Sequence, residues 1–143
     1  MQFKQIDNTY FVYLEKGEAV VDVLTNFCKD QNISNGYISG IGAVNNIELG
    51  AYDTKTKGYI KRSFKETHEL INYQGNIMLL DEKPFIHAHI TIGDHNMELF
   101  GGHLFSMNIA VVGEFIIRNI NGDSKRTFNP DVGFATWDLC KIK

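Results

Sequence analysis

Residues 84–92 read PFIHAHITI, and this stretch decides how the chain is expected to fold. Apolar side chains stand at positions 86, 88, 90 and 92, while His87 and His89 alternate with them. Because successive side chains of a β-strand point to opposite faces, the pattern predicts a strand with one apolar face. Its other face carries Phe85 and both histidines, so the strand is anchored to a core while it presents two imidazoles.

Further β-rich segments lie on both sides of this strand. They cover residues 9–14, 37–44, 47–53, 59–65, 69–73, 76–80, 97–100, 109–119 and 134–139, with Gly, Asn, Asp or Pro between them. One helix is predicted from Glu18 to Phe27, where apolar residues follow helical spacing and acidic residues stand near the start. One principal helix packed with a mostly antiparallel β-sheet makes α+β the expected fold class.

The composition is typical of one domain that spans residues 1–143. A hydrophobic content of 43% allows a real core, and no linker, repeat or low-complexity tract interrupts the chain. The formal net charge of −3 disfavours a dedicated nucleic-acid binder, which more often carries a basic excess. No apolar run reaches the ~18 residues that cross a bilayer and no signal peptide is visible, so we expect a cytoplasmic protein without membrane contact. Cys28 and Cys140 form no CxxC pair and are expected to be buried or half-buried.

A third histidine follows in the sequence FGGHL at residues 100–104. Gly101 and Gly102 permit backbone shapes that are closed to other residues and let the chain approach a neighbour. The turn sequence GDHN at residues 93–96 predicts that the next strand returns antiparallel. We therefore expect His103 to lie beside the two histidines of the first strand.

Three neutral imidazoles with one open position suit Zn²⁺ or another divalent metal, with water or a small anion as the fourth ligand. The alternative is that these histidines are ordinary polar residues on a partly wet sheet face. His68 and His95 lack comparable support and are expected to be exposed. An open zinc site could also lower the pKa of bound water to ~7 and support a hydrolase or lyase. Glu69 and Glu114 are the candidate general bases, although both also fit as solvated strand residues.

Two further patterns have competing interpretations. The cations within residues 55–65 fit a solvated hairpin, or else an arm that contacts nucleic-acid phosphates. These cations are Lys55, Lys57, Lys61, Arg62 and Lys65. The GIG sequence at residues 40–42 precedes a strand rather than a helix, so close backbone packing at a turn or subunit contact explains it better than a dinucleotide site.

Nearly the whole chain resembles the plant and prokaryote conserved (PPC) domain family. The landmarks appear in the family's order: Gly17-Glu18, Gly42-Ala43-Val44, Leu49-Gly50-Ala51-Tyr52-Asp53, Glu69-Leu70, Gly75-Asn76-Ile77, Pro84, His87-Ala88-His89, Gly101-Gly102-His103-Leu104 and Glu114. The resemblance implies an α+β domain that assembles as a homotrimer. It also implies that the three histidines lie near a subunit interface and that some members hold a metal ion, zinc.

In plants this domain accompanies AT-hook motifs in DNA-binding proteins, and stand-alone prokaryotic members are commonly called DNA-binding on that basis. The present chain contains no Arg-Gly-Arg-Pro AT-hook. It also has Met107 where many members have a small residue, which predicts a narrower pocket. Three hypotheses follow: a regulatory module that associates with DNA directly or through a partner, a zinc-dependent hydrolase or lyase, and an assembly module without metal.

Overall fold

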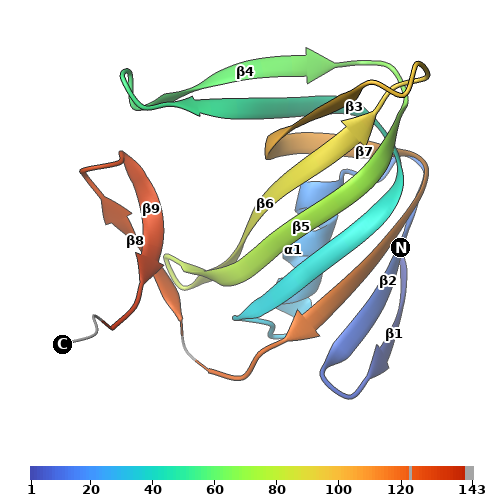
Figure 1. Cartoon of the computed structure of the whole chain (residues 1–143). Helices are drawn as coiled ribbons and strands as arrows, with labels where there is room; N and C mark the ends of the chain where they lie inside the picture. The colour runs from blue at the N-terminus through green and yellow to red at the C-terminus, as the bar shows by residue number, and fades with distance from the viewer. Residues whose placement is uncertain (123, 141–143) are drawn as a thin grey trace.

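The computed structural model describes residues 1–122 and 124–140. These residues form one helix and nine strands, in agreement with the predicted α+β class (Figure 1). In chain order they are β1 (Gln2–Ile6), β2 (Thr9–Glu15), α1 (Val20–Asp30), β3 (Gly36–Asp53), β4 (Gly58–Phe64), β5 (His68–Leu80), β6 (Lys83–Gly93), β7 (Leu99–Asn119), β8 (Lys125–Asn129) and β9 (Phe134–Asp138).

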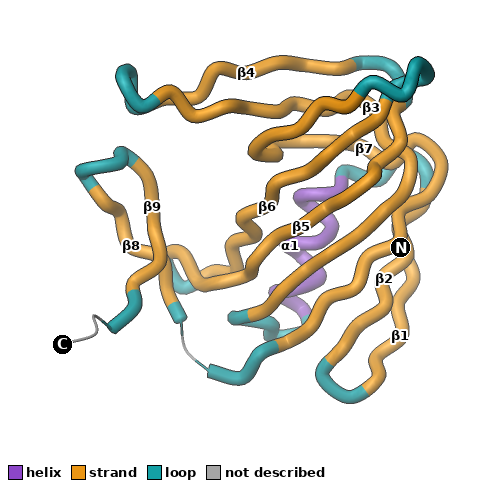
Figure 2. The backbone as a smooth tube through the Cα atoms, in the orientation of Figure 1, coloured by secondary structure: helices purple, strands orange, loops and turns teal. Residues whose placement is uncertain are grey.

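The strands form one curled sheet that bends around α1. Its order is β1-β2-β7-β3-β5-β8-β9, while β4 pairs with β3, and β6 pairs with both β5 and β7. The long strand β7 pairs with β6 through its first part and with β2 through its second, which bends the sheet and places α1 on its inner side (Figure 2). The described pairings are antiparallel except for the contact between β5 and β8.

Two hairpins extend from this sheet, and both matter for the site. The end of β3 and the whole of β4 form a two-stranded arm, here called the β3–β4 arm (residues 47–65), at the top of Figure 1. The β8–β9 hairpin lies beyond the ends of β5 and β6. None of the described residues forms a helix long and apolar enough to cross a membrane.

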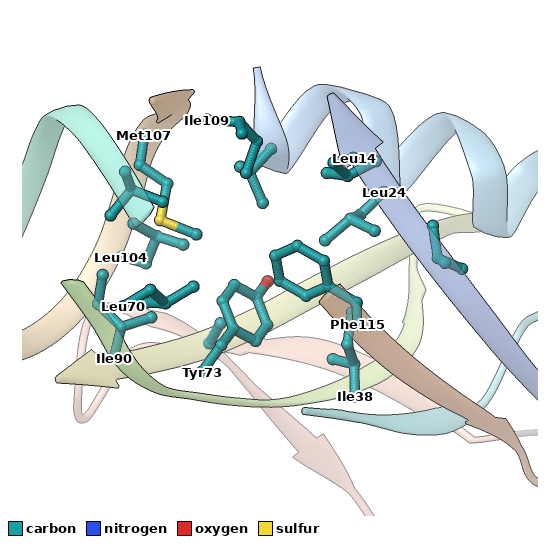
Figure 3. Close-up of a cluster of buried hydrophobic side chains, with 14 of the residues drawn as sticks. Leu14, Leu24, Ile38, Leu70, Tyr73, Ile90, Leu104, Met107, Ile109 and Phe115 are labelled. Carbon is teal, nitrogen blue, oxygen red and sulfur yellow. The ribbon is translucent and has the colours of Figure 1, made fainter. Parts of the chain in front are cut away.

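The centre of the core is an aromatic pair on the inner face of the sheet. The rings of Tyr73 and Phe115 lie 5.3 Å apart, edge to face, among buried aliphatic side chains (Figure 3). A Cβ atom at Gly40 would lie only 2.3 Å from Cδ1 of Phe115. Close packing is thus present at Gly40, but it lies within β3 against β7 of the same chain and not at the predicted turn.

The structure joins several segments that the sequence separates. Residues 37–44 and 47–53 belong to β3, residues 69–73 and 76–80 to β5, and residues 97–100 and 109–119 largely to β7. Register shifts within β3 absorb the irregular residues, which explains why the sequence pattern breaks there. Strand β1 was not predicted because all five of its side chains are exposed and leave no burial pattern.

Two predictions about single residues are wrong. His68 is buried, with 7% of its surface exposed, because Nδ1 pairs with the carbonyl oxygen of Glu66 at 2.9 Å and the ring packs against Phe64. Cys140 is exposed, whereas Cys28 is buried as predicted. His95 is exposed, also as predicted.

Candidate metal centre

The three predicted histidines meet on one face of the sheet. His87 and His89 lie on β6, and His89 pairs directly with His103 of β7. Directly paired residues share a face, so all three rings converge. Their centroids lie 5.0 to 5.5 Å apart, and one nitrogen atom from each residue can be chosen so that the three lie within 4.8 Å of one another.

The glycines before His103 let β7 approach its neighbours. A Cβ atom at Gly102 would lie 2.8 Å from the carbonyl oxygen of Gly50, and one at Gly101 would lie 3.0 Å from that of Ile90. Any larger residue at position 102 would push β7 away from β3, where Gly50 pairs with His103. The predicted close approach at both glycines is therefore confirmed.

Aromatic rings hold the imidazole of His103. The ring of Tyr59 lies 4.9 Å from it and that of Phe105 lies 4.8 Å from it. Burial raises the pKa of Tyr59, with a further contribution from Tyr52. Nδ1 of His103 is buried and has no hydrogen-bond partner among the described residues. A buried polar atom without a partner is energetically costly. A metal ion would supply the missing partner of this nitrogen.

Arg126 of β8 is a site residue that the sequence analysis missed. Only 7% of its surface is exposed. Its Nη2 donates to Oδ1 of Asn76 at 2.9 Å and lies 3.0 Å from Nδ1 of His87, while its Nη1 donates to the carbonyl oxygen of Ala135. No signal in the sequence could have found it, since β8 has no motif and was not predicted as a strand.

The surroundings keep two of the histidines neutral. Burial lowers the pKa of His87 to about 4, assisted by the charge of Arg126. Burial also lowers the pKa of His103 to about 4, with smaller contributions from His89, Arg126 and Lys61. A histidine that binds a metal ion must be neutral, so neither ring would first have to lose the proton of a charged imidazolium at neutral pH.

These pKa shifts predict an acid sensitivity of the metal-free protein. In the unfolded chain both histidines have the ordinary pKa of 6.5, whereas in the folded protein the value is about 4. Between these pH values the unfolded state binds about two more protons per chain than the folded state does. The stability that the two neutral histidines contribute is therefore fully present above pH 6.5, and it is lost as the pH falls toward 4. Urea unfolding of chelator-treated protein across this range measures the slope, and the double variant His87→Gln/His103→Gln should flatten it.

The structure does not bring the two candidate bases to the histidines. Glu69 is exposed on β5, five residues from Gln74, which pairs with His89, so about 17 Å of strand separates them. Glu114 is exposed on β7 and pairs with Tyr13 and Ile41. Among the described residues, the group that could hold a metal ion contains histidines alone. A hydrolase or lyase reaction at this centre would therefore proceed without either carboxylate as a nearby base.

The cations of the β3–β4 arm are distributed over both of its faces. Lys61 pairs with Glu48 at 2.7 Å. Arg62, the next residue, lies on the opposite face with its guanidinium over the ring of Phe64. Nζ of Lys57 donates to the carbonyl oxygen of Pro130, and Lys55 and Lys65 are exposed.

Met107 does not narrow a pocket beside the histidines. It is buried in the core near Leu104 and Ile109 (Figure 3). The prediction of a narrower ligand site is wrong because this side chain points to the inner side of the sheet.

Comparison with known proteins identifies the family. The family model named Plants and Prokaryotes Conserved (PCC) domain matches residues 1–121. The chain belongs to this family. This membership confirms the resemblance to the plant and prokaryote conserved family that the sequence indicated. PCC and PPC are two abbreviations for that one family. The match ends before the β8–β9 hairpin begins.

Three solved structures share the PCC fold over nearly their full length. A "putative DNA binding protein" from Bacteroides thetaiotaomicron is 36% identical, with a TM-score of 0.93 and 96% of each chain covered. A PPC protein from Pyrococcus horikoshii is 31% identical, with a TM-score of 0.87 and coverage of 99% of this chain and 97% of that one. A metal-containing protein from Archaeoglobus fulgidus is 29% identical, with a TM-score of 0.86 and coverage of 97% and 99%. A search of curated proteins finds no match.

Proposed function

We propose that this PCC-family protein is a homotrimeric regulatory module in which His87, His89 and His103 bind one zinc ion. The observation that carries the proposal is the convergence of three imidazoles, and the buried, unpaired Nδ1 of His103 supports it. The metal-containing relative from A. fulgidus supports it. Zinc would supply a Lewis-acidic centre with an open position, and this chain's residues would use that position to stabilise the fold or to sense a small ligand.

Exposed apolar residues on the outer face of the sheet support assembly of the proposed trimer. Phe11, Ile41 and Ile116 are each more than 40% exposed and line a groove of about 670 Å³. Contiguous apolar surface of this kind favours burial against another subunit. Ile116 pairs with Ser39, which pairs with Gln74, which in turn pairs with His89. The groove and the histidines thus share one sheet face, which suits a metal centre near a subunit boundary.

Association with DNA is the regulatory part of the proposal. The relative from B. thetaiotaomicron bears a DNA-binding name, which supports this assignment. The cations of the β3–β4 arm are the groups that would contact phosphates, and trimer symmetry would present three such arms. The net charge of −3 favours contact through these arms or through a protein partner over broad attraction to DNA.

Metal content and mass, measured together on untagged protein, test this proposal. Plasma mass spectrometry should find about one zinc per chain, and sedimentation should give the mass of a trimer. Ile116→Asp should dissociate the trimer, because a carboxylate would be buried without a partner in the interface. Met97→Asp is the matched control, since Met97 is 84% exposed in a turn outside the groove. A monomeric wild-type protein would refute the trimer, and no metal after zinc is supplied would refute the metal centre.

A further inference from the structure

The β8–β9 hairpin contacts the histidine site and lies outside the segment that the family model matches. At its base, Lys125 pairs with Leu79 of β5 and Arg126 reaches His87. At its tip, the carbonyl oxygen of Val132 accepts a hydrogen bond from the hydroxyl of Tyr52, 2.6 Å away on the β3–β4 arm. The hairpin is therefore held at both ends and places one guanidinium group at the site.

The contact between Arg126 and His87 fixes the proton on the imidazole. A guanidinium group donates hydrogen bonds and accepts none, so Nδ1 of His87 must be the acceptor at 3.0 Å. The hydrogen of the neutral ring then resides on Nε2. Neither nitrogen offers a free lone pair, because one faces Arg126 and the other carries the hydrogen.

This arrangement is the opposite of the one that favours a metal. A metal-bound histidine normally donates its second N–H to a carboxylate or a carbonyl oxygen. Here a cation occupies that place, and among the described residues no carboxylate joins the three histidines to offset its charge. A divalent ion bound through either nitrogen of His87 must therefore break the contact with Arg126, against repulsion between two positive groups.

A small carboxylate would resolve this conflict. Nε of Arg126 is buried and has no hydrogen-bond partner among the described residues, so the guanidinium already has an unused donor. Burial lowers the pKa of Arg126 from its ordinary value, yet a guanidinium of this kind stays charged in proteins. Its planar donors match the two oxygen atoms of a carboxylate, and a carboxylate is also a good ligand for the open position of zinc.

We propose that Arg126 blocks His87 in the metal-free protein, and that zinc binds together with a small carboxylate that pairs with Arg126. This inference rests on the proposed metal centre. Binding of the two ligands is then coupled, so that the carboxylate raises the affinity for zinc by the same factor as zinc raises the affinity for the carboxylate.

Zinc titration against a chromophoric chelator tests the coupling, at fixed ionic strength in sodium chloride and in sodium acetate. After the measured affinity has been corrected for the binding of acetate to free zinc, acetate should increase the zinc affinity of the wild-type protein by about tenfold or more. Arg126→Met should bind zinc at least about tenfold more tightly than wild type in chloride and should lose the effect of acetate. Arg126→Lys retains the charge and should stay close to wild type in chloride.

Arg118→Met is the matched control, because Arg118 is an exposed arginine of β7 that pairs with Thr9 and Tyr37, away from His103, and it should behave as wild type. Equal zinc affinity in wild type and Arg126→Met, or no effect of acetate on wild type, would overturn the inference while leaving the metal centre intact. Absence of zinc binding in every variant would instead reject the proposed function.

A second measurement uses the wild-type protein alone and requires no zinc. Long-range ¹H–¹⁵N spectra of the metal-free wild-type protein report which nitrogen of a neutral histidine carries the hydrogen. His87 should show the hydrogen on Nε2. A hydrogen on Nδ1 would exclude the contact with Arg126 and overturn the inference.

Discussion

Replacing His103 with alanine is expected to lower the affinity for zinc by at least about two orders of magnitude, because it removes one of the three proposed ligands. His103 lies on a different strand from the other two proposed ligands, and its ring packs against Tyr59 and Phe105. No other described Asp, Glu, Cys or His joins the group to replace it. Competition with a chromophoric chelator measures the loss.

The matched control is His95→Ala, which removes an exposed histidine from the turn between β6 and β7. It should bind zinc as the wild-type protein does. Thermal unfolding of metal-free His103→Ala must show a folded protein, so that the loss is assigned to the ligand. Unchanged zinc affinity in folded His103→Ala would mean that zinc binds to other residues.

Replacing Phe115 with alanine is expected to lower the free energy of unfolding by about 3 to 5 kcal/mol. Only 2% of Phe115 is exposed, and its ring packs edge to face against Tyr73. Gly40 lies so close to the ring that its backbone forms one wall of the pocket. Because β-sheet backbone on one side cannot collapse into the space, the cavity should stay largely open.

Urea unfolding at a fixed protein concentration measures this loss, since dissociation of an oligomer would otherwise contribute. Phe128→Ala is the matched control, because Phe128 is 65% exposed on β8 and its removal leaves no cavity. Its effect should stay within about 0.5 kcal/mol. A similar loss in both variants would mean that Phe115 does not anchor the core.

Much of the site could be predicted because it depends on local patterns. The alternation around His87 and His89 fixes which face of β6 they share, whatever strand lies beside them. The turn at residues 93–96 makes the next strand return antiparallel, which brings His103 opposite His89. Both features follow from short-range backbone geometry, so they do not depend on how the rest of the sheet is arranged.

Other features depend on contacts that leave no trace in the local sequence. His68 was expected to be exposed, yet a pocket made with Phe64 and Phe100 buries it. Glu69 and Glu114 were candidate bases, yet the register of β5 and β7 keeps both out of the histidine cluster. A residue's neighbours across a sheet are set by pairing register, which a single sequence specifies only weakly.

The sequence by itself determined the α+β class, the family and the three histidines on one sheet face, because strand periodicity and turn chemistry act over a few residues. Only the tertiary structure decided what faces those histidines. Arg126 meets His87 across 39 residues of chain, through a hairpin that returns beside β5. Such a contact depends on how the whole sheet curls, so the cation beside the histidines can be identified only from the folded chain.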